Sequence, residues 1–309
     1  MVVRIDGLAD VLTTRPDAGS LPLVVIGVRA AHDNTRVDHM AAPVFDVVVD
    51  DGDQRLDTVV ATIARHPVAS ASLAVLLRAG AHLSVEHALA AESAVYSTLQ
   101  SGAEFAAWRA GSTRSPAPPD THPAVVADRV GDTLRIVLDR PHRHNAFSRS
   151  MRDALSEMLA LAVADRSIAR VELSGNGPSF CSGGDLGEFG SFGDPASAHT
   201  TRLTRSPARL LYRLADRTHV QLHGACMGAG IELAAFAASV TAHPDATIAL
   251  PEVDLGLIPG AGGTVSIPRR IGRQRCALLA LGGAITAATA SAWGLVDAVS
   301  PTTAAAWHP

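Results

Sequence analysis

The second half of this chain alternates short runs of β-branched and apolar residues with longer stretches of helical periodicity. Strands are expected at 134–138, 171–173, 220–222 and 247–250, and helices at 148–164, 206–215 and 229–238. Parallel strands need a long crossover connection, which is usually a helix. The alternation therefore predicts an α/β fold with a largely parallel sheet.

A segment rich in proline and small polar residues, GSTRSPAPPDTHP at 111–123, separates this half from the rest of the chain. The preceding residues, LSVEHALAAESAVYSTLQSGAEFAAWRA, have helical periodicity, whereas clusters of Pro and Ser are typical of linkers. We therefore predict a mostly helical N-terminal region at 1–110, a linker at 111–123 and a second unit at 124–309.

All 26 basic residues are arginine, so no lysine can form a Schiff base or serve in a phosphate-binding loop. The 30 acidic residues give a formal net charge of −4. Proteins that neutralise nucleic-acid phosphates instead concentrate basic charge on one face. Nucleic acid is therefore not expected as a partner.

Three cysteines, Cys181, Cys226 and Cys276, are too few and too irregularly spaced for a disulfide framework, which favours a reducing compartment. The N-terminal stretch contains acidic residues and lacks the apolar core of a signal peptide. Residues 276–296 carry no charge, but a Gly-Gly pair and several Ser and Thr residues favour two short helices over a membrane span. We expect a cytoplasmic protein with no membrane partner.

Three glycine-rich stretches mark the second half: FCSGGD at 180–185, GACMGAGIEL at 224–233 and PEVDLGLIPGAGGT at 251–264. A turn of small residues that runs into a helix leaves unpaired backbone N–H groups, which favour negative charge. Two such turns facing one carbonyl would form an oxyanion hole. A dinucleotide fingerprint does not fit, because no stretch follows the first strand of a βαβ unit with an acidic residue at the expected distance.

Two carboxylates accompany these turns. Glu232 lies just inside the helix expected from 229, and Glu252 follows Pro251 at the end of a strand. A base beside an oxyanion hole suits proton transfer at the carbon next to a thioester, and two carboxylates can hold a water between them. The structural alternative is that Glu232 caps a helix and Glu252 belongs to a surface loop.

The order and spacing of these stretches resemble the crotonase superfamily, the enoyl-CoA hydratase/isomerase family. The resemblance runs from HNAF at 144–147 through FCSGGD, HGACMGAGIELA, LPEVDLGLIPGAGGT and AWGLVDAV. It implies a crotonase-like ββα spiral core at 124–309, an additional mostly helical N-terminal region and an acyl-CoA thioester substrate.

By this resemblance, the backbone N–H groups of Gly184 and Ala229 would form the oxyanion hole. Ala229 stands where the family usually has glycine, although the role requires only a backbone N–H. Glu232 would activate water, and Glu252 would exchange the proton at the α-carbon. A loop over the CoA adenine, acting mainly through backbone groups, would comprise Arg143, His144, Asn145 and Ala146.

Other polar residues receive structural interpretations. His142 and His144 form an HxH pair without a third ligand in a plausible local arrangement, so no metal site is expected. Cys181 has no basic sequence neighbour that would lower the pKa of its thiol, and we expect it to pack. Asp185 is expected to cap backbone groups, while Asp254 could face either the pocket or solvent.

The predicted reaction is hydration of a trans-2-enoyl-CoA, or its reverse, because both glutamate positions are filled. No cofactor is implied, since coenzyme A is part of the substrate. Δ3,Δ2-enoyl-CoA isomerisation, which can use Glu252 alone, stays open, as do a cofactor-independent aryl-acetyl-CoA oxygenase and a non-catalytic acyl-CoA-binding subunit. The resemblance also implies a homotrimer or a dimer of trimers.

Family members continue past GLVDAV into a helical part that covers the site, whereas this sequence ends shortly afterwards. The N-terminal stretch from Phe45 resembles that part in order: strand end, amphipathic helix, helix, helix. We predict that it has been moved or duplicated to the front. The helices within 55–110 should then pack over the core near the acyl pocket or at a subunit contact.

Overall fold

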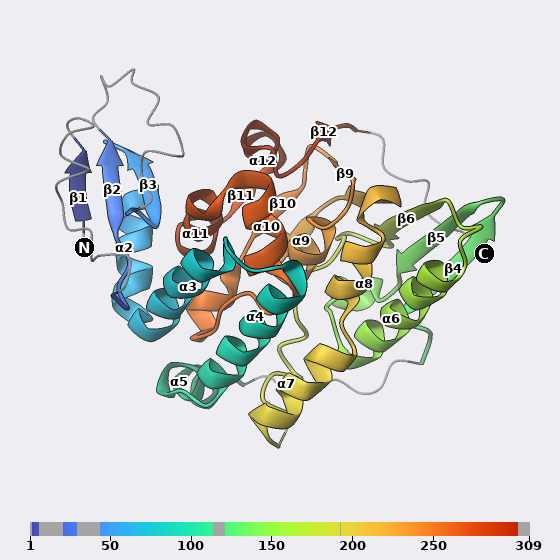
Figure 1. Ribbon diagram of the computed structural model, residues 1–309, viewed down its shortest axis with the longest axis horizontal. Coiled ribbons are helices and arrows are strands. Elements are labelled where there is room, and N and C mark those ends of the chain that lie inside the picture. Colours follow the sequence, from blue (N-terminus) through green and yellow to red (C-terminus); the bar gives the residue numbers. More distant parts are fainter. Residues whose placement is uncertain (1, 6–20, 30–43, 114–120, 192, 302–309) are drawn as a thin grey trace.

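The computed structural model describes residues 2–5, 21–29, 44–113, 121–191 and 193–301 (Figure 1). The predicted linker at 111–123 falls mostly outside these ranges. The predicted division into 1–110 and 124–309 stays a prediction.

Six strands of the second half form one sheet in the order β12-β9-β7-β6-β5-β4. Their bounds are β4 Val125–Val130, β5 Thr133–Leu138, β6 Arg170–Gly175, β7 Thr218–Leu222, β9 Ser239–Ala242 and β12 Ala298–Val299. β4 and β5 form an antiparallel hairpin whose turn contains Gly131 at φ +63°, and the other pairs are parallel. The prediction of a largely parallel sheet is confirmed.

A smaller sheet in the order β11-β10-β8 brings the glycine-rich stretches together. Its strands are β8 Ala225–Met227, β10 Thr247–Ala249 and β11 Ile285–Thr286. The N–H of Met227 donates to the carbonyl of Cys181 at 2.9 Å, and the N–H of Gly228 donates to the carbonyl of Ala249 at 2.9 Å. The first stretch therefore lies beside the second, and the second beside the strand that leads into the third.

Helices connect and cover these strands. They are α6 Arg149–Ala164, α7 Pro195–Thr204, α8 Pro207–Arg213, α9 Ala229–Ala234, α10 Gly263–Ile271, α11 Arg273–Leu281 and α12 Ala287–Trp293, with the short 3₁₀ turns η2 Pro141–Arg143, η3 Ala215–Arg217 and η4 Pro251–Leu255. The uncharged stretch 276–296 lies mainly in two short helices, α11 and α12, as predicted. The helix expected at 229–238 ends earlier, at Ala234.

The N-terminal region contains four described helices and a small parallel sheet. The helices are α2 Arg55–Arg65, α3 Pro67–Gly80, α4 Val85–Gln100 and α5 Ala103–Gly111, and the sheet consists of β1 Val2–Ile5, β2 Ile26–Arg29 and β3 Val47–Asp50. Sequence analysis anticipated the helices but not the sheet, which lies at the far end of the molecule from β4 (Figure 1). No single helix in the described part of the chain is long and apolar enough to span a membrane; α2 and α3 reach that length only together, across a bend of 110°.

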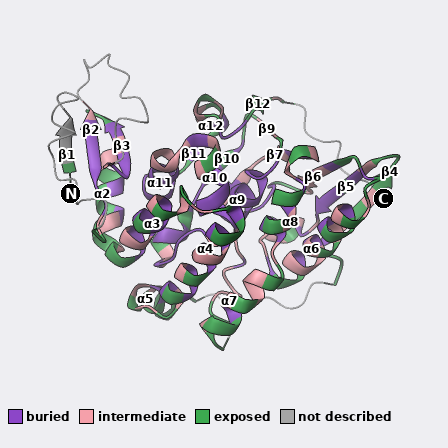
Figure 2. Cartoon of the chain, in the orientation of Figure 1, coloured by how far each residue is buried: buried purple, intermediate pink, exposed green. Residues whose placement is uncertain are grey.

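The N-terminal helices pack directly on the second half. Helix α4 contacts α7, α8 and α10, whereas α2 and α3 contact α11. Leu73 and Leu77 of α3 share one buried apolar cluster with Ile267 and Leu278 of the second half, and Figure 2 shows buried residues across this junction. The expectation that the helices within 55–110 cover the core is confirmed for the described residues.

Candidate active site

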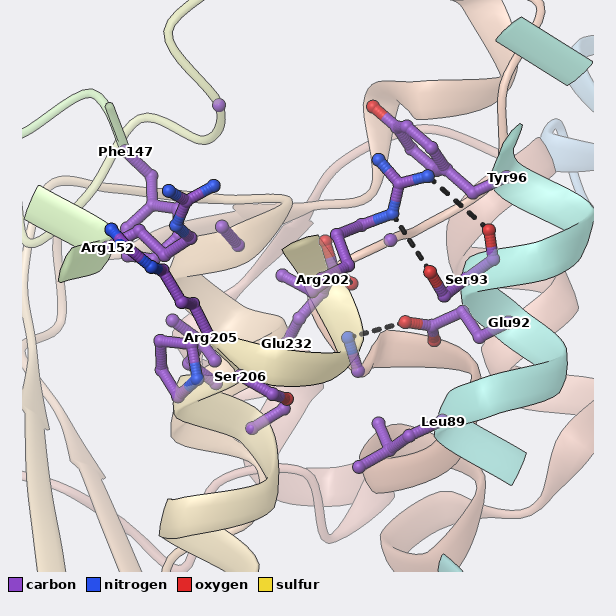
Figure 3. Close-up of a pocket in the computed structure, with 18 of the residues that line it drawn as sticks. Leu89, Glu92, Ser93, Tyr96, Phe147, Arg152, Arg202, Arg205, Ser206 and Glu232 are labelled. Atoms are coloured by element: carbon purple, nitrogen blue, oxygen red, sulfur yellow. Dashed lines mark hydrogen bonds between the residues drawn. The ribbon is translucent and has the colours of Figure 1, made fainter. Parts of the chain in front are cut away.

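A cavity of about 270 Å³ lies where α4 of the N-terminal region faces α7, α8 and α9 of the second half (Figure 3). Its walls combine apolar side chains, including Leu89, Phe147 and Leu233, with several carboxylates and arginines. Four residues that sequence analysis assigned to the reaction line this cavity: Gly184, Ala229, Glu232 and Glu252. The first and last of these, Gly184 and Glu252, are about 70 positions apart in the sequence. The two sheets therefore bring distant motifs to one site.

Two backbone N–H groups in the cavity wall have no acceptor within the part of the chain that the structure describes. Ala229 is the first residue of α9, where a helix cannot satisfy its own N–H groups. Gly184 is held by its neighbours, since Phe147 donates to the carbonyl of Gly183 at 2.7 Å and Asp185 donates to the carbonyl of Phe147 at 3.1 Å. Among the described residues, no acceptor takes the N–H of Gly184 or of Ala229. Both donors are available to a ligand oxygen.

Glycine at 228 is required by the turn that precedes α9. Gly228 has φ +47°, and a Cβ at this position would lie 2.1 Å from Oε1 of Glu252. The left-handed backbone and the close approach both exclude larger residues. This glycine therefore allows the carboxylate of Glu252 to lie against the start of α9.

Glu232 projects from α9 and is 1% exposed. Its Oε2 accepts hydrogen bonds from the N–H groups of Ala261 at 2.7 Å and Gly263 at 2.8 Å. Burial and the nearby carboxylates of Glu252 and Glu92 raise the pKa of Glu232, whereas the two backbone donors favour its ionised form. The anion of Glu232 therefore has two direct backbone donors.

Glu252 lies in η4 and is 7% exposed. Its Oε2 is buried and has no hydrogen-bond partner within the part of the chain that the structure describes. Burial raises the pKa of Glu252 to about 8. The protonated carboxyl is therefore the favoured form near neutral pH.

A third buried carboxylate, Glu92 of α4, was missed by sequence analysis. Its Oε1 accepts the N–H of Gly262 at 2.7 Å, and its Oε2 accepts the N–H of Thr264 at 2.9 Å and the hydroxyl of Thr264 at 2.6 Å. Burial raises the pKa of Glu92 to about 7. The four successive N–H groups from 261 to 264 thus alternate between Glu232 and Glu92.

A sequence signal for Glu92 did exist. The buried positions of α4 recur at helical spacing, and Glu92 lies within this apolar stripe. A glutamate on the apolar face of an amphipathic helix rarely stays buried without partners. The partners could not be identified, however, because they lie about 170 residues away in the sequence.

The predicted CoA-binding loop lies beside the cavity and does not line it. Asn145 is fully buried: its Oδ1 accepts the N–H of Arg140 at 2.7 Å, and its Nδ2 donates to the carbonyl of Ser179 at 2.8 Å. His144 and Asn145 both have φ +52°, a conformation that these side-chain bonds hold. Arg143 and Ala146 flank this pair, and the next residue, Phe147, is the one that reaches the cavity.

The structure also settles the surroundings of three further residues. Asp185 is 3% exposed, bonds Arg140 at 3.2 Å and accepts the N–H of Gly187 at 3.2 Å, in agreement with a backbone-capping role. Asp254 forms an exposed ion pair with Arg65 of α2 at 3.0 Å and does not line the cavity. Cys181 is buried, which raises the pKa of its thiol to about 12. No group of three or more potential metal ligands occurs among the residues that the structure describes.

Comparisons with known proteins identify the family. The family described as Enoyl-CoA hydratase/isomerase matches residues 131–306, more than half of the chain. An enoyl-CoA isomerase/hydratase of Mycosarcoma maydis is 36% identical over 54% of this chain and 64% of its own length, so the chain spans less than two thirds of that relative. The 2,3-dehydroadipyl-CoA hydratase of Escherichia coli is 33% identical over 57% of this chain and 69% of its own length.

Solved structures lead to the same conclusion. An enoyl-CoA hydratase from Thermoplasma volcanium superposes with a TM-score of 0.53 at 34% identity, over 59% of this chain and 73% of that one. The enoyl-CoA hydratase from Bacillus anthracis superposes with a TM-score of 0.53 at 29% identity, over 58% of this chain and 70% of that one. The chain belongs to the enoyl-CoA hydratase/isomerase family, whose members act on acyl-CoA thioesters, and its second half has the crotonase fold.

Proposed function

We propose that the protein adds water across the 2,3 double bond of a trans-2-enoyl-CoA to give the 3-hydroxyacyl-CoA. The observation that carries this proposal is the convergence of two buried glutamates and two unpaired backbone N–H groups in one cavity. An acid, a base and an oxyanion hole in one site are what addition to a conjugated thioester requires.

In the proposed reaction, the N–H groups of Gly184 and Ala229 donate to the thioester oxygen. Negative charge develops on that oxygen as water attacks carbon 3, so these donors stabilise the enolate-like transition state. Removal of one such donor typically costs roughly 10²- to 10³-fold in rate. Both groups belong to the backbone, so the alanine at 229 retains the donor.

The two glutamates divide the proton transfers. Glu232, whose anion receives the N–H groups of Ala261 and Gly263, accepts a proton from the attacking water. Glu252, whose raised pKa favours the protonated form, delivers a proton to carbon 2. Mutual repulsion between buried carboxylates disfavours ionisation of both, which supports one acid and one base at the same pH.

The remaining assignments are part of the same proposal. The loop of Arg143, His144, Asn145 and Ala146 contacts the adenine end of CoA, next to Phe147 at the cavity. The reaction uses no cofactor other than the CoA carried by the substrate. A trimer or a dimer of trimers, acting in the cytoplasm, is the expected form of the protein.

A second candidate is Δ3,Δ2-enoyl-CoA isomerisation. Glu252 alone could move a proton between carbons 2 and 4, because its Oε2 has no protein partner among the described residues. Glu232 would then serve only to hold residues 261–263. The two reactions differ in their dependence on Glu232, which makes them separable by experiment.

The test is the loss of enoyl-thioester absorbance with crotonyl-CoA, measured for the wild type beside Glu232→Gln and Glu252→Gln. We expect each substitution to lower kcat by at least roughly 10²-fold, the usual range for a general acid or base. Glu86→Gln is the matched control, because Glu86 lines the same cavity but is exposed. Conversion of a trans-3-enoyl-CoA that survives Glu232→Gln would instead indicate the isomerase, and no turnover of either substrate would refute the proposal.

A further inference from the structure

Arg202 of α7 is a cation in the cavity wall that contacts only neutral groups. Its Nε donates to the hydroxyl of Ser93 at 3.1 Å, its Nη2 donates to the hydroxyl of Ser97, and its guanidinium lies 4.7 Å from the centre of the Tyr96 ring. Within the described part of the chain, no carboxylate lies within ion-pair distance of Arg202. Burial lowers the pKa of its guanidinium, which reflects the lost hydration.

Two other arginines of the cavity wall already have an anionic partner. Arg152 and Arg205 both pair with Asp153, at 2.8 Å and 2.7 Å. Glu92 attracts Arg202 through space, but its two carboxylate oxygens accept N–H groups from the start of α10. A partly desolvated guanidinium without a contacting anion is unfavourable unless a ligand supplies one.

Free donors remain on this part of the wall. A guanidinium has five N–H donors, and the Nη1 of Arg202 has a single weak contact, to Gln100 at 3.5 Å. Tyr96 lines the cavity, and its hydroxyl forms no hydrogen bond with the described residues. Burial raises the pKa of Tyr96, so its hydroxyl stays a neutral donor. One guanidinium edge and one phenol can therefore bind an anionic acceptor.

The position of these donors points to the acyl chain. In Figure 3, Arg202 and Tyr96 lie on one side of Glu232, and Phe147 lies on the other. Phe147 directly follows the loop assigned to CoA, so a thioester that enters past Phe147 would place its acyl chain towards Arg202. Leu89 and Leu233 line the same cavity and suit the methylene groups of such a chain.

We propose that Arg202, assisted by the hydroxyl of Tyr96, forms a subsite for a carboxylate at the distal end of the acyl group, so that the protein selects ω-carboxyacyl-CoA thioesters over simple acyl-CoA thioesters. The orientation of the substrate rests on the proposed function, but the subsite itself requires only binding. A carboxylate matches the planar guanidinium and also accepts the phenol hydrogen.

The experiment is calorimetric binding of two unreactive saturated thioesters of equal chain length, 5-carboxypentanoyl-CoA and hexanoyl-CoA. Wild-type protein should bind the carboxylated thioester more tightly, by roughly 10- to 100-fold, as expected for a hydrogen bond between charged groups. Arg202→Gln should remove this preference and leave the affinity for hexanoyl-CoA within a few-fold of wild type. Because neither ligand reacts, the result does not depend on hydration or isomerisation.

Matched variants separate the subsite from other roles of Arg202. Tyr96→Phe keeps the ring against the guanidinium and should reduce the preference only in part, whereas Arg202→Lys should restore some of it. Arg205→Gln is the control, because Arg205 also lines the cavity but is paired with Asp153 and is 60% exposed. Thermal melting of each variant reports whether α7 stays docked on α4.

Two results would overturn the subsite. Equal affinity of wild-type protein for both thioesters would show that no carboxylate is recognised. An equal loss for both thioesters in Arg202→Gln would show that Arg202 serves the CoA phosphates or only fastens α7 to α4. In the latter case, binding of the corresponding N-acetylcysteamine thioesters, which lack phosphates, distinguishes these two roles.

Discussion

At the scale of single residues, Glu92 links the N-terminal region to the chemistry of the second half. It holds the N–H groups of Gly262 and Thr264, and the intervening N–H of Gly263 donates to Glu232. Each carboxylate therefore helps to hold the segment 261–264, whose N–H groups also donate to the other carboxylate. Glu92 does not need to touch substrate to influence the reaction, because it positions the donors that favour the Glu232 anion.

Glu92→Gln should disturb this arrangement, because an amide presents one acceptor and one donor where two acceptors are needed. We expect kcat on crotonyl-CoA to fall roughly 10- to 10²-fold, with a smaller change in KM. The pH profile of kcat should also shift, because the pKa of Glu232 changes when its backbone donors move. Glu86→Gln, an exposed substitution on the same helix, should leave both unchanged. An unaltered pH profile in a folded Glu92→Gln protein would contradict the positioning role.

The raised pKa of Glu252 makes stability depend on pH. In the unfolded chain this carboxyl ionises near its ordinary value of 4.5, whereas in the folded protein it keeps its proton up to about 8. The folded state therefore binds more protons between these values, and the free energy of unfolding should decrease as pH rises through this window. Denaturant midpoints at several pH values should show a shallower decline for Glu252→Gln, and parallel curves for the two proteins would contradict the assignment.

At the scale of elements, motifs predicted the parts of the site that are local in sequence. Gly184 and Ala229 lie at turns of small residues, where backbone chemistry favours an oxyanion hole, and the resemblance to the crotonase superfamily assigned the particular residues and Glu232. Arg202 and Glu92 were not predicted, because their partners come from helices far away in the chain. Helices rich in alanine, leucine and glutamate look alike in sequence, and only packing shows which face meets the cavity.

The small sheet of the N-terminal region is held to the second half by Asp46. This residue is 2% exposed, pairs with Arg78 of α3 at 2.5 Å and Arg273 of α11 at 3.2 Å, and accepts the N–H of Val25 at 2.9 Å. Asp46→Asn would leave two partly buried arginines without their anion. We expect a loss of about 3–5 kcal/mol in the free energy of unfolding by urea, as for other broken buried pairs.

Asp50→Asn provides the matched comparison for Asp46. Asp50 also pairs with an arginine, Arg29, at 2.5 Å, but its side chain is 58% exposed. Exposed pairs contribute about 0–1 kcal/mol, so this variant should unfold close to wild type. Equal losses in the two variants would show that burial of Asp46 does not determine its contribution.

At the scale of the whole molecule, the two halves of the sequence build one site. Helix α4 contributes Glu92, Ser93 and Tyr96 to a cavity whose predicted reacting groups belong to the second half. The packing of α3 and α4 on α10 and α11 is what a displaced C-terminal helical part would be expected to show. The permutation itself stays a prediction.

Packing of this kind predicts that the peptide connection between the halves is dispensable once the protein has folded. A specific protease site placed within 111–123 should allow cleavage without separation, since contacts of α4 with α7 and α10, and of α3 with α11, bury apolar surface. The cleaved protein should elute as one species in size-exclusion chromatography and should retain crotonyl-CoA turnover within a few-fold. An uncleaved sample of the same variant is the control. Separation of the fragments under native conditions would instead mean that only the peptide connection keeps the N-terminal region next to the second half. The position of Glu92 beside the segment 261–264 would then depend on that connection.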